Sequence, residues 1–311
     1  MDEKSMYDIE IKNFVKKYNQ LTAVANLSFS VAKGELFGLI GPDGAGKTTL
    51  MRSICTLLVP SSGSILVKGL EVTRNIAAIR SLLGYMPQRF SLYLDLTVEQ
   101  NLRFFAELFQ VPPHEYEDRL QQLYQFSRLE PFKKRLAGAL SGGMKQKLAL
   151  SCALIHTPEI LILDEPTFGV DPVSRQEFWN ILHSIRQQGT TILVSTAYMD
   201  EANQCDRVAL LFNGQLRGLG TPSELRATYQ YPLYRLQGAN LPELENYFRQ
   251  QSQVHITQKF GDALHVSFYQ KPEETFWQAC QESTAGNLRQ WAVQAPSIED
   301  IFLELMGSAD E

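Results

Sequence analysis

The stretch from Gly41 to Thr49 constrains the fold of this chain more than any other. It reads Gly-Pro-Asp-Gly-Ala-Gly-Lys-Thr-Thr, a complete G-x-x-x-x-G-K-T pattern, and lies between an apolar run and a helical pattern that begins at Leu50. Glycines let the backbone curl so that successive N–H groups face a phosphate, while the lysine adds positive charge and the threonine hydroxyl can ligate Mg²⁺. The pattern therefore predicts a strand, a phosphate-binding loop and a helix that together bind ATP or GTP. The predicted nucleotide contacts are Gly41, Pro42, Asp43, Gly44, Ala45, Gly46, Lys47, Thr48 and Thr49.

Composition narrows the class of protein. The 311 residues, 44% of them hydrophobic, are enough for about two domains with a sizeable core. The formal net charge of -5 gives no electrostatic reason to expect nucleic acid as the main partner. The four cysteines show no metal-type spacing, and no signal segment or long apolar span is evident. We therefore expect a cytoplasmic protein that reaches a membrane only through a partner.

The order of apolar patterns predicts an α/β architecture. Strand-like runs at the N-terminus precede the phosphate loop, and a βαβ rhythm returns from Ile160 onward. A helical subdomain is predicted at about 88–157, inside an ATP-binding domain of residues 1–229. Residues 230–311 show the order βαββαβ and a closing helix, which predicts a small second α+β domain with no chemical constellation of its own.

Two adjacent carboxylates follow a buried strand pattern. Ile160-Leu161-Ile162-Leu163 leads into Asp164 and Glu165. A carboxylate here can hold Mg²⁺, and its neighbour can polarise the water that attacks a γ-phosphate. We predict Asp164 as a metal ligand and Glu165 as the catalytic base; a plain helix cap is the alternative interpretation.

Small residues also open a helix at Ser141, Gly142 and Gly143, which creates a second site where backbone N–H groups and a positive helix end could meet an anion. Alone this is a weak signal. Placed between the phosphate loop and the Asp164-Glu165 pair, it resembles the signature motif of ATP-binding cassette (ABC) ATPases. The resemblance covers almost the entire chain.

That resemblance assigns roles to three further residues. It implies that Tyr18 stacks on adenine, that Gln88 senses Mg²⁺ and contributes to catalysis, and that Asp171 communicates between two nucleotide sites of a dimer. Read without the family, they would be a packed strand aromatic, a surface amide and a helix-entry turn.

The resemblance also implies a mechanism and partners. Two cassettes would pair head to tail, as a homodimer or a heterodimer, with each ATP and its Mg²⁺ held between one phosphate loop and the other subunit's Ser-Gly-Gly. Gly-Pro-Asp-Gly, Ser-Gly-Gly-Met and the terminal motif over 296–305 are similar to ATPases of ABC-2 type exporters, including one cassette of tandem-cassette forms. A separate ABC-2 type transmembrane permease is the implied partner, and the location is the cytoplasmic face of the cell membrane. Phe90 to Leu94 is the candidate contact, with a buried core segment as the alternative.

One position departs from the family pattern. Relatives usually carry histidine where this chain has Ala197, and that imidazole would contact the γ-phosphate. A methyl group there predicts weakened hydrolysis more than weakened binding. Either the residue was replaced to trap a nucleotide-bound state, or the site is the degenerate half of a pair. A hydrolysis-impaired cassette and a non-transport ABC ATPase acting in translation or DNA repair are therefore the alternative functions.

Overall fold

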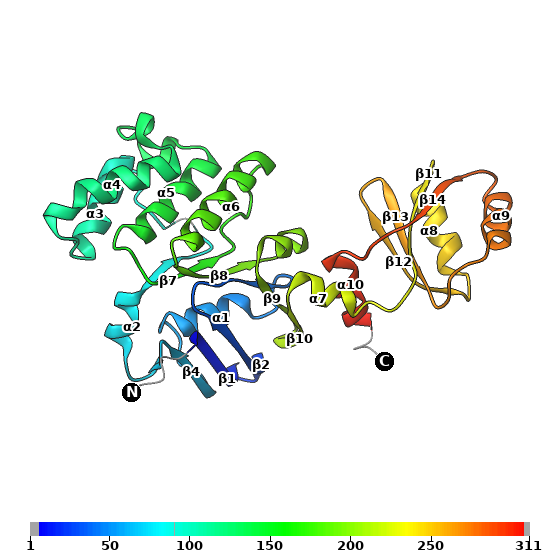
Figure 1. The fold of residues 1–311 in the computed structure, drawn as a ribbon, viewed down its shortest axis with the longest axis horizontal. Coiled ribbons are helices and arrows are strands. Elements are labelled where there is room, and N and C mark those ends of the chain that lie inside the picture. The colour runs from blue at the N-terminus through cyan, green and yellow to red at the C-terminus, as the bar shows by residue number, and fades with distance from the viewer. Residues whose placement is uncertain (1–5, 90, 308–311) are drawn as a thin grey trace. The chain divides into compact units, whose positions relative to one another are not determined.

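The computed structural model describes residues 6–89 and 91–307, and backbone packing divides them into two compact units on either side of Pro222 and Ser223. Each unit has its own sheets and helices (Figure 1). The predicted α/β fold with a mixed sheet and an added α+β domain is confirmed. No helix within the described ranges is long and apolar enough to cross a membrane.

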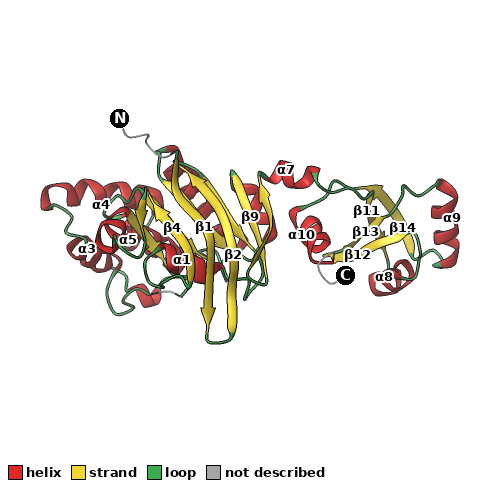
Figure 2. Ribbon diagram, turned by 90° about the horizontal axis from the view of Figure 1, so that it is seen from below, coloured by secondary structure: helices red, strands yellow, loops and turns green. Residues whose placement is uncertain are grey.

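The first sheet of the N-terminal unit is antiparallel, with the order β2-β1-β4-β5. Its strands are β1 (Tyr7–Tyr18), β2 (Leu21–Ala32), β4 (Ser62–Val67) and β5 (Leu70–Glu71). β1 and β2 form a long hairpin (Figure 2), which turns at Asn19 with a φ of 54°. Asparagine tolerates that left-handed conformation better than most residues. The hairpin carries Tyr18 at its tip.

The second sheet is mixed, with the order β10-β9-β3-β8-β7-β6. Its strands are β3 (Leu36–Ile40), β6 (Leu83–Met86), β7 (Ile160–Asp164), β8 (Thr191–Thr196), β9 (Arg207–Phe212) and β10 (Gln215–Gly220). All neighbouring pairs are parallel except β9 with β10. Every residue of β3, β7 and β8 is buried, as a parallel sheet covered on both faces requires. Their carboxyl ends therefore meet at one edge, where the predicted site residues lie.

The helices of the N-terminal unit include a group of three that pack against one another in an apolar cluster of their own. The helices of the unit are α1 (Lys47–Ile54), α2 (Ile76–Leu82), α3 (Val98–Leu108), α4 (Pro113–Ser127), α5 (Gly142–Leu154) and α6 (Pro172–Gln187), with 3₁₀ turns η1 (Glu130–Phe132), η2 (Ala137–Ala139) and η3 (Met199–Gln204). A further helix, α7 (Pro222–Ala227), begins at the division between the two units. Buried residues of α3, α4 and α5 share one apolar cluster. Thr97 caps the N-terminus of α3. Its side chain accepts from the backbone N–H of Gln100, and the Gln100 side chain accepts from the backbone N–H of Thr97, so local hydrogen bonds determine where this helix begins.

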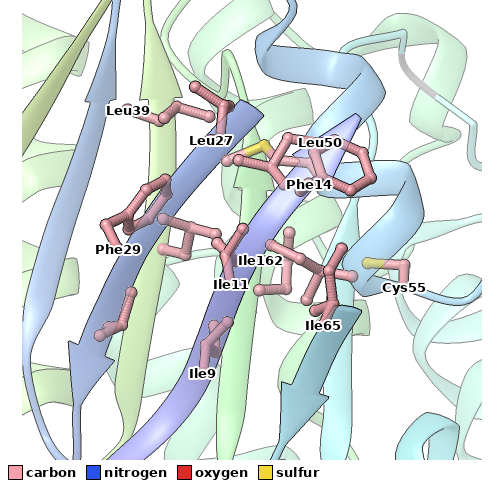
Figure 3. Packing of buried hydrophobic residues seen from close by; sticks show 14 of the residues in the cluster. Ile9, Ile11, Phe14, Leu27, Phe29, Leu39, Leu50, Cys55, Ile65 and Ile162 are labelled. Carbon is pink, nitrogen blue, oxygen red and sulfur yellow. The ribbon is translucent and has the colours of Figure 1, made fainter. Parts of the chain in front are cut away.

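The main core lies between the two sheets and α1 (Figure 3). Ile9, Ile11 and Phe14 of β1 pack with Leu50 of α1 and Ile162 of β7. Burying each such side chain stabilises the fold by about 1.5–3 kcal/mol. Because α1 and β7 share this core, the phosphate loop and the strand that ends in Asp164 are held in one rigid body.

The C-terminal unit has the order β11 (Leu233–Gly238), α8 (Leu241–Arg249), β12 (Val254–Phe260), β13 (Ala263–Phe268), α9 (Glu274–Ser283), β14 (Leu288–Val293) and α10 (Ile298–Gly307). Its sheet is antiparallel, with the order β12-β13-β11-β14. The predicted βαββαβ order is confirmed. An aromatic cluster that includes Phe248, Phe268 and Trp277 forms the core under the helices.

Candidate functional site

The phosphate loop joins β3 to α1, and its backbone requires glycine at two positions. Gly46, the residue before α1, has a φ of 98°, and a Cβ there would lie 2.8 Å from Val24 Cγ2 and 2.9 Å from Ala23 O. A Cβ on Gly41 would lie 2.2 Å from Leu211 O. Larger residues at either position would push the loop away from the sheet. The glycines thus keep the N-terminus of α1 directed at the loop's concave side.

Lys47 and Glu165 form a buried ion pair. Lys47 Nζ lies 2.9 Å from Glu165 Oε1, and the two side chains are only 3% and 5% exposed. Lys47 Nζ also donates to Gly41 O at 2.7 Å and to Pro42 O at 3.0 Å. Two charges without water between them interact strongly, so each sets the position of the other. The arrangement holds a cation and a carboxylate side by side at the mouth of the loop.

Asp164 ends β7 and is completely buried. Its Oδ1 accepts hydrogen bonds from Ser195 Oγ at 2.7 Å and from Thr48 Oγ1 at 3.1 Å. Burial raises the pKa of Asp164, and these two hydrogen bonds oppose the rise. Among the described residues Asp164 Oδ2 has no hydrogen-bond partner. An unpartnered carboxylate oxygen beside a threonine hydroxyl is a donor set that suits Mg²⁺, which prefers oxygen ligands and usually takes one or two carboxylates plus substrate phosphates.

Gln88 reaches the same place from the loop that follows β6. Its Nε2 donates to Glu165 Oε2 at 2.8 Å. Glu165 has a φ of 49°, and its backbone N–H donates to Ser195 Oγ at 3.0 Å. A non-glycine residue in this conformation is uncommon and is held by its surroundings. The carboxylate predicted as the catalytic base is therefore fixed by Lys47, Gln88 and Ser195.

A cavity of about 400 Å³ collects most of the predicted nucleotide contacts. It is lined by Tyr18, Leu21, Ala23, Asp43, Gly44, Ala45, Gly46, Lys47, Thr48, Thr49, Gln88 and Glu165. Tyr18 is 42% exposed, and Lys16 Nζ lies 5.2 Å from the centre of its ring. An exposed aromatic face beside a phosphate loop is suited to stacking on a base.

Ser141, Gly142 and Gly143 are not among the residues that line this cavity. Ser141 and Gly142 are exposed at the start of α5, where Ser141 Oγ accepts from Met144 N at 3.3 Å. Gly143 is buried against α6, since a Cβ there would lie 2.6 Å from the side chain of Ser174. The Ser-Gly-Gly of this chain thus lies outside its own nucleotide cavity.

Asp171 is close to that second surface. It begins α6, is exposed, and its Oδ1 accepts from Ser174 N at 2.9 Å. This backbone hydrogen bond lowers the pKa of Asp171. Ser174 therefore contacts both Gly143 and Asp171, and the structure brings these two predicted residues together outside the cavity.

Ala197 follows directly after β8, on the phosphate-loop side of the sheet. The residue before it is tied to the loop, because Gly41 N donates to Thr196 O at 3.2 Å. Tyr198 N donates to Thr196 Oγ1 at 3.0 Å, which closes a tight turn around position 197. The side chain at 197 is a methyl group, which has no hydrogen-bonding capacity toward a phosphate.

Sequence reasoning missed two polar residues that organise this edge of the sheet. Ser195 links Asp164 and Glu165 through one hydroxyl, and Glu201 accepts hydrogen bonds from Thr167 Oγ1 at 2.8 Å and from Trp179 Nε1 at 3.0 Å. A serine at the end of an otherwise apolar strand was the available signal for the first. The second lies in the polar 3₁₀ turn η3, and the sequence carries no signal for it unless the neighbouring segments are known.

Comparison with known proteins gives consistent matches. A family model described as "ABC transporter" matches residues 24–168. The probable multidrug ABC transporter ATP-binding protein YbhF of Escherichia coli (strain K12) is 44% identical over 219 residues, which are 70% of this chain and 38% of that protein. The Nod factor export ATP-binding protein I of Sinorhizobium fredii is 36% identical over 307 residues, or 98% of this chain and 87% of that protein.

A solved structure of an ATP-binding subunit of an ABC transporter superposes with a TM-score of 0.65 at 32% identity and covers 71% of this chain and 92% of its own. The chain therefore spans most of the Nod factor relative but well under half of YbhF.

Proposed function

This chain belongs to the ABC transporter family as an ATP-binding cassette, a class of ATPases coupled to transport, and we propose that it is the energy-coupling subunit of an exporter. Such cassettes dimerise and work with transmembrane subunits. The observation that carries the proposal is the division of the motifs. The phosphate loop, Glu165 and Gln88 line one cavity, while Ser141 and Gly142 are exposed on a different surface.

The proposed cycle begins with ATP in the 400 Å³ cavity. Tyr18 stacks on the base, the N–H groups of 43–48 surround the phosphates, and Lys47 contributes its charge to the β and γ oxygens. Thr48, Gln88 and Asp164 would hold Mg²⁺, which when bound offsets the negative charge of the phosphates. The Ser-Gly-Gly of a second cassette, identical or different, closes over the γ-phosphate.

Hydrolysis then depends on Glu165. In the ion pair with Lys47 its Oε1 is 2.9 Å from the ammonium. A γ-phosphate competes for that ammonium, so Glu165 can exchange Lys47 for the attacking water and accept its proton. Gln88 orients the carboxylate through Oε2, and Asp171 transmits the state of the site to the partner cassette. Loss of the bridging γ-phosphate reopens the pair and drives the transmembrane partner through its cycle.

We assign the transmembrane partner to the ABC-2 permease type and place the complex on the cytoplasmic face of the membrane. Docking on a transmembrane partner is supported by the segment after Gln88, where Tyr93 is 46% and Leu94 52% exposed. The Tyr93 ring packs edge-on against the Phe104 ring, with 4.8 Å between the ring centres. Exposed aromatic and aliphatic side chains suit a partner helix. Leu92 does not belong to this docking patch, because it is buried among α3–α5 residues. Phe90 lies outside the described residues.

The domain boundaries carry over into this proposal. We infer an ATP-binding domain at residues 1–229, with its helical subdomain at about 88–157, and a regulatory or dimer-contact domain at 230–311. The division between the two compact units falls a few residues earlier, between Pro222 and Ser223. The C-terminal sheet has two edge strands, β12 and β14, available for such a contact.

The test is co-purification of the full chain with a membrane protein and stimulation of its ATPase activity by that partner. Tyr93→Asp with Leu94→Asp should abolish both, whereas Leu57→Asp, at a residue equally exposed at 52%, should leave both intact. Unchanged association of the double variant contradicts docking through this patch. ATPase stimulation by ribosomes or DNA in place of a membrane partner contradicts the exporter assignment.

A further inference from the structure

Glu201 is a buried carboxylate that the cycle above does not use. It lies in η3 and is 2% exposed. Its Oε1 accepts from Thr167 Oγ1 at 2.8 Å and from Trp179 Nε1 at 3.0 Å, and Arg175 Nε lies 3.7 Å away. Among the described residues Glu201 Oε2 has no hydrogen-bond partner. A buried carboxylate whose nearest cation is 3.7 Å away and whose second oxygen has no hydrogen-bond partner among the described residues contributes little to stability. Apolar residues of similar volume often stabilise a fold as well or better.

Glu201 and its partners lie on three segments, which follow the Asp164-Glu165 pair, Asp171 and position 197 respectively. Thr167 follows the Asp164-Glu165 pair, Trp179 and Arg175 lie on the helix that begins with Asp171, and Glu201 itself follows position 197. One carboxylate oxygen therefore connects the strand end that bears the catalytic carboxylate with the segment that bears position 197.

The short segment between Thr196 and Glu201 is fixed at both ends. At one end Thr196 O accepts from Gly41 N of the phosphate loop at 3.2 Å. At the other, the Arg175 guanidinium lies over the Tyr198 ring at 3.9 Å, and the same Arg175 faces Glu201. Stacking and ion pairing thus hold the backbone on the far side of Ala197. A displacement of about 1 Å in a reacting group costs up to roughly a hundredfold in rate, so such anchoring matters for whatever side chain stands at 197.

We propose that Glu201 is a positioning residue of the nucleotide site, which fixes the backbone at position 197 by joining the 196–201 segment to α6 and to the loop after β7. This inference rests on the proposed function and deepens it. Glu201 is not among the residues that line the nucleotide cavity, so it acts through the backbone of the segment. Its effect is therefore seen only when the side chain at 197 has something to contribute.

The experiment is a double-mutant cycle in the full chain that combines Ala197→His with Glu201→Ala, measured as phosphate release at saturating ATP and Mg²⁺. Ala197→His alone should raise kcat at least about tenfold. In the Glu201→Ala background the same substitution should raise kcat less than about threefold, because the imidazole is no longer held in place. The Kd for a fluorescent ATP analogue should change less than about threefold throughout, since the phosphate loop is intact.

Two further variants separate positioning from loss of structure. Glu201→Gln keeps an oxygen that accepts from Thr167 and Trp179, so it should retain most of the tenfold gain even if Glu201→Ala does not fold. Asp200→Ala removes the exposed neighbouring carboxylate of the same turn and should leave the full gain.

An undiminished gain from Ala197→His in the Glu201→Ala chain, or an equal loss in Asp200→Ala, overturns the inference. No gain in any background also overturns it, because position 197 then contributes nothing to hydrolysis. Failure of the wild-type chain to bind the analogue is a separate result, which contradicts the proposed function itself.

Discussion

Each unit of the chain buries an aspartate, and the two carboxylates are partnered in different ways. In the C-terminal unit Asp300 Oδ1 lies 2.9 Å from His265 Nδ1, and Asp300 Oδ2 accepts from Ser297 N at 2.8 Å and from Ser297 Oγ at 2.6 Å. In the N-terminal unit Asp164 Oδ1 has two donors, but Oδ2 has none among the residues described.

The two pKa values shift in opposite directions. Burial raises the pKa of Asp164 despite its hydrogen bonds. Burial also acts to raise the pKa of Asp300, but hydrogen bonds from His265 and Ser297 outweigh it and lower the pKa. A buried carboxylate with every oxygen satisfied fixes structure, as Asp300 does at the start of α10. One left partly unsatisfied at a strand end is costly to the apo fold and is suited to a ligand.

The largest expected effect concerns Glu165, the neighbour of the unsatisfied aspartate. Glu165→Gln removes the proposed base but keeps the shape of the side chain, so phosphate release should fall at least about a hundredfold. ATP binding should persist, because Lys47 and the loop glycines remain. Steady-state phosphate release and equilibrium analogue binding measure the two quantities. Glu159→Gln, at a half-exposed carboxylate one strand length upstream, is the matched control and should behave as wild type.

Next in size is the effect of Asp300→Ala in the C-terminal unit. It leaves the imidazole of His265 and the backbone N–H of Ser297 without their acceptor, so the free energy of unfolding should fall by about 2 kcal/mol. Denaturant unfolding followed by tryptophan fluorescence reports it, since Trp277 and Trp291 lie in this unit. Glu299→Ala, at the exposed neighbour, should cost less than about 0.5 kcal/mol. Equal losses for the two variants would remove the structural role assigned to Asp300.

The smallest effect has the opposite sign and is the sharpest test of the comparison. Asp164→Asn removes a buried charge, so in the absence of nucleotide and metal it should raise the free energy of unfolding at pH 7 by about 1 kcal/mol. The pKa of Asp164 is raised in the folded state, so its protonated form favours folding at low pH and that contribution is lost as pH rises through the folded pKa.

The advantage of Asp164→Asn should therefore shrink as the pH falls through the raised pKa of Asp164, where the wild-type carboxyl takes up its proton. Unfolding titrations at several pH values measure this trend. With ATP and Mg²⁺ the order should reverse, because the wild type alone gains ligand stabilisation. A destabilising Asp164→Asn at neutral pH without ligand would break the comparison, since both aspartates would then be structural.

The parts of the fold and of the candidate site that depend on residues close together in the sequence could be predicted from the sequence. The glycines of the phosphate loop are required by the conformation of the loop's own backbone. Four apolar residues of β7 are followed directly by two carboxylates. The loop and the carboxylate pair can therefore both be predicted from local sequence. The βαββαβ order was predictable from period and turns. The links made by Ser195 and Glu201 were not, because they depend on β8 lying beside β7 and on α6 packing against η3. Such adjacency follows from tertiary packing, which no local pattern encodes.

The segment after Gln88 illustrates the same limit. Its residues are mostly apolar, and the sequence alone predicts a docking surface, with a buried core segment as the alternative. The structure divides it: Leu92 packs inside the helical cluster, while Tyr93 and Leu94 are exposed. Asn101 fixes the backbone at this division, since the N–H of Tyr93 donates to Asn101 Oδ1 at 3.1 Å.

The most direct test of the account is the mass of the Glu165→Gln chain in solution with ATP and Mg²⁺, measured by light scattering. In the proposed cycle the exposed Ser-Gly-Gly closes on a partner's nucleotide, and this variant cannot hydrolyse it. We therefore predict twice the monomer mass of 35.2 kDa with ATP and the monomer mass without it. Gly142→Asp in the same chain should prevent the doubling by placing a negative charge against the γ-phosphate. A monomer at saturating ATP, alone and with the membrane partner supplied, would contradict the shared nucleotide site.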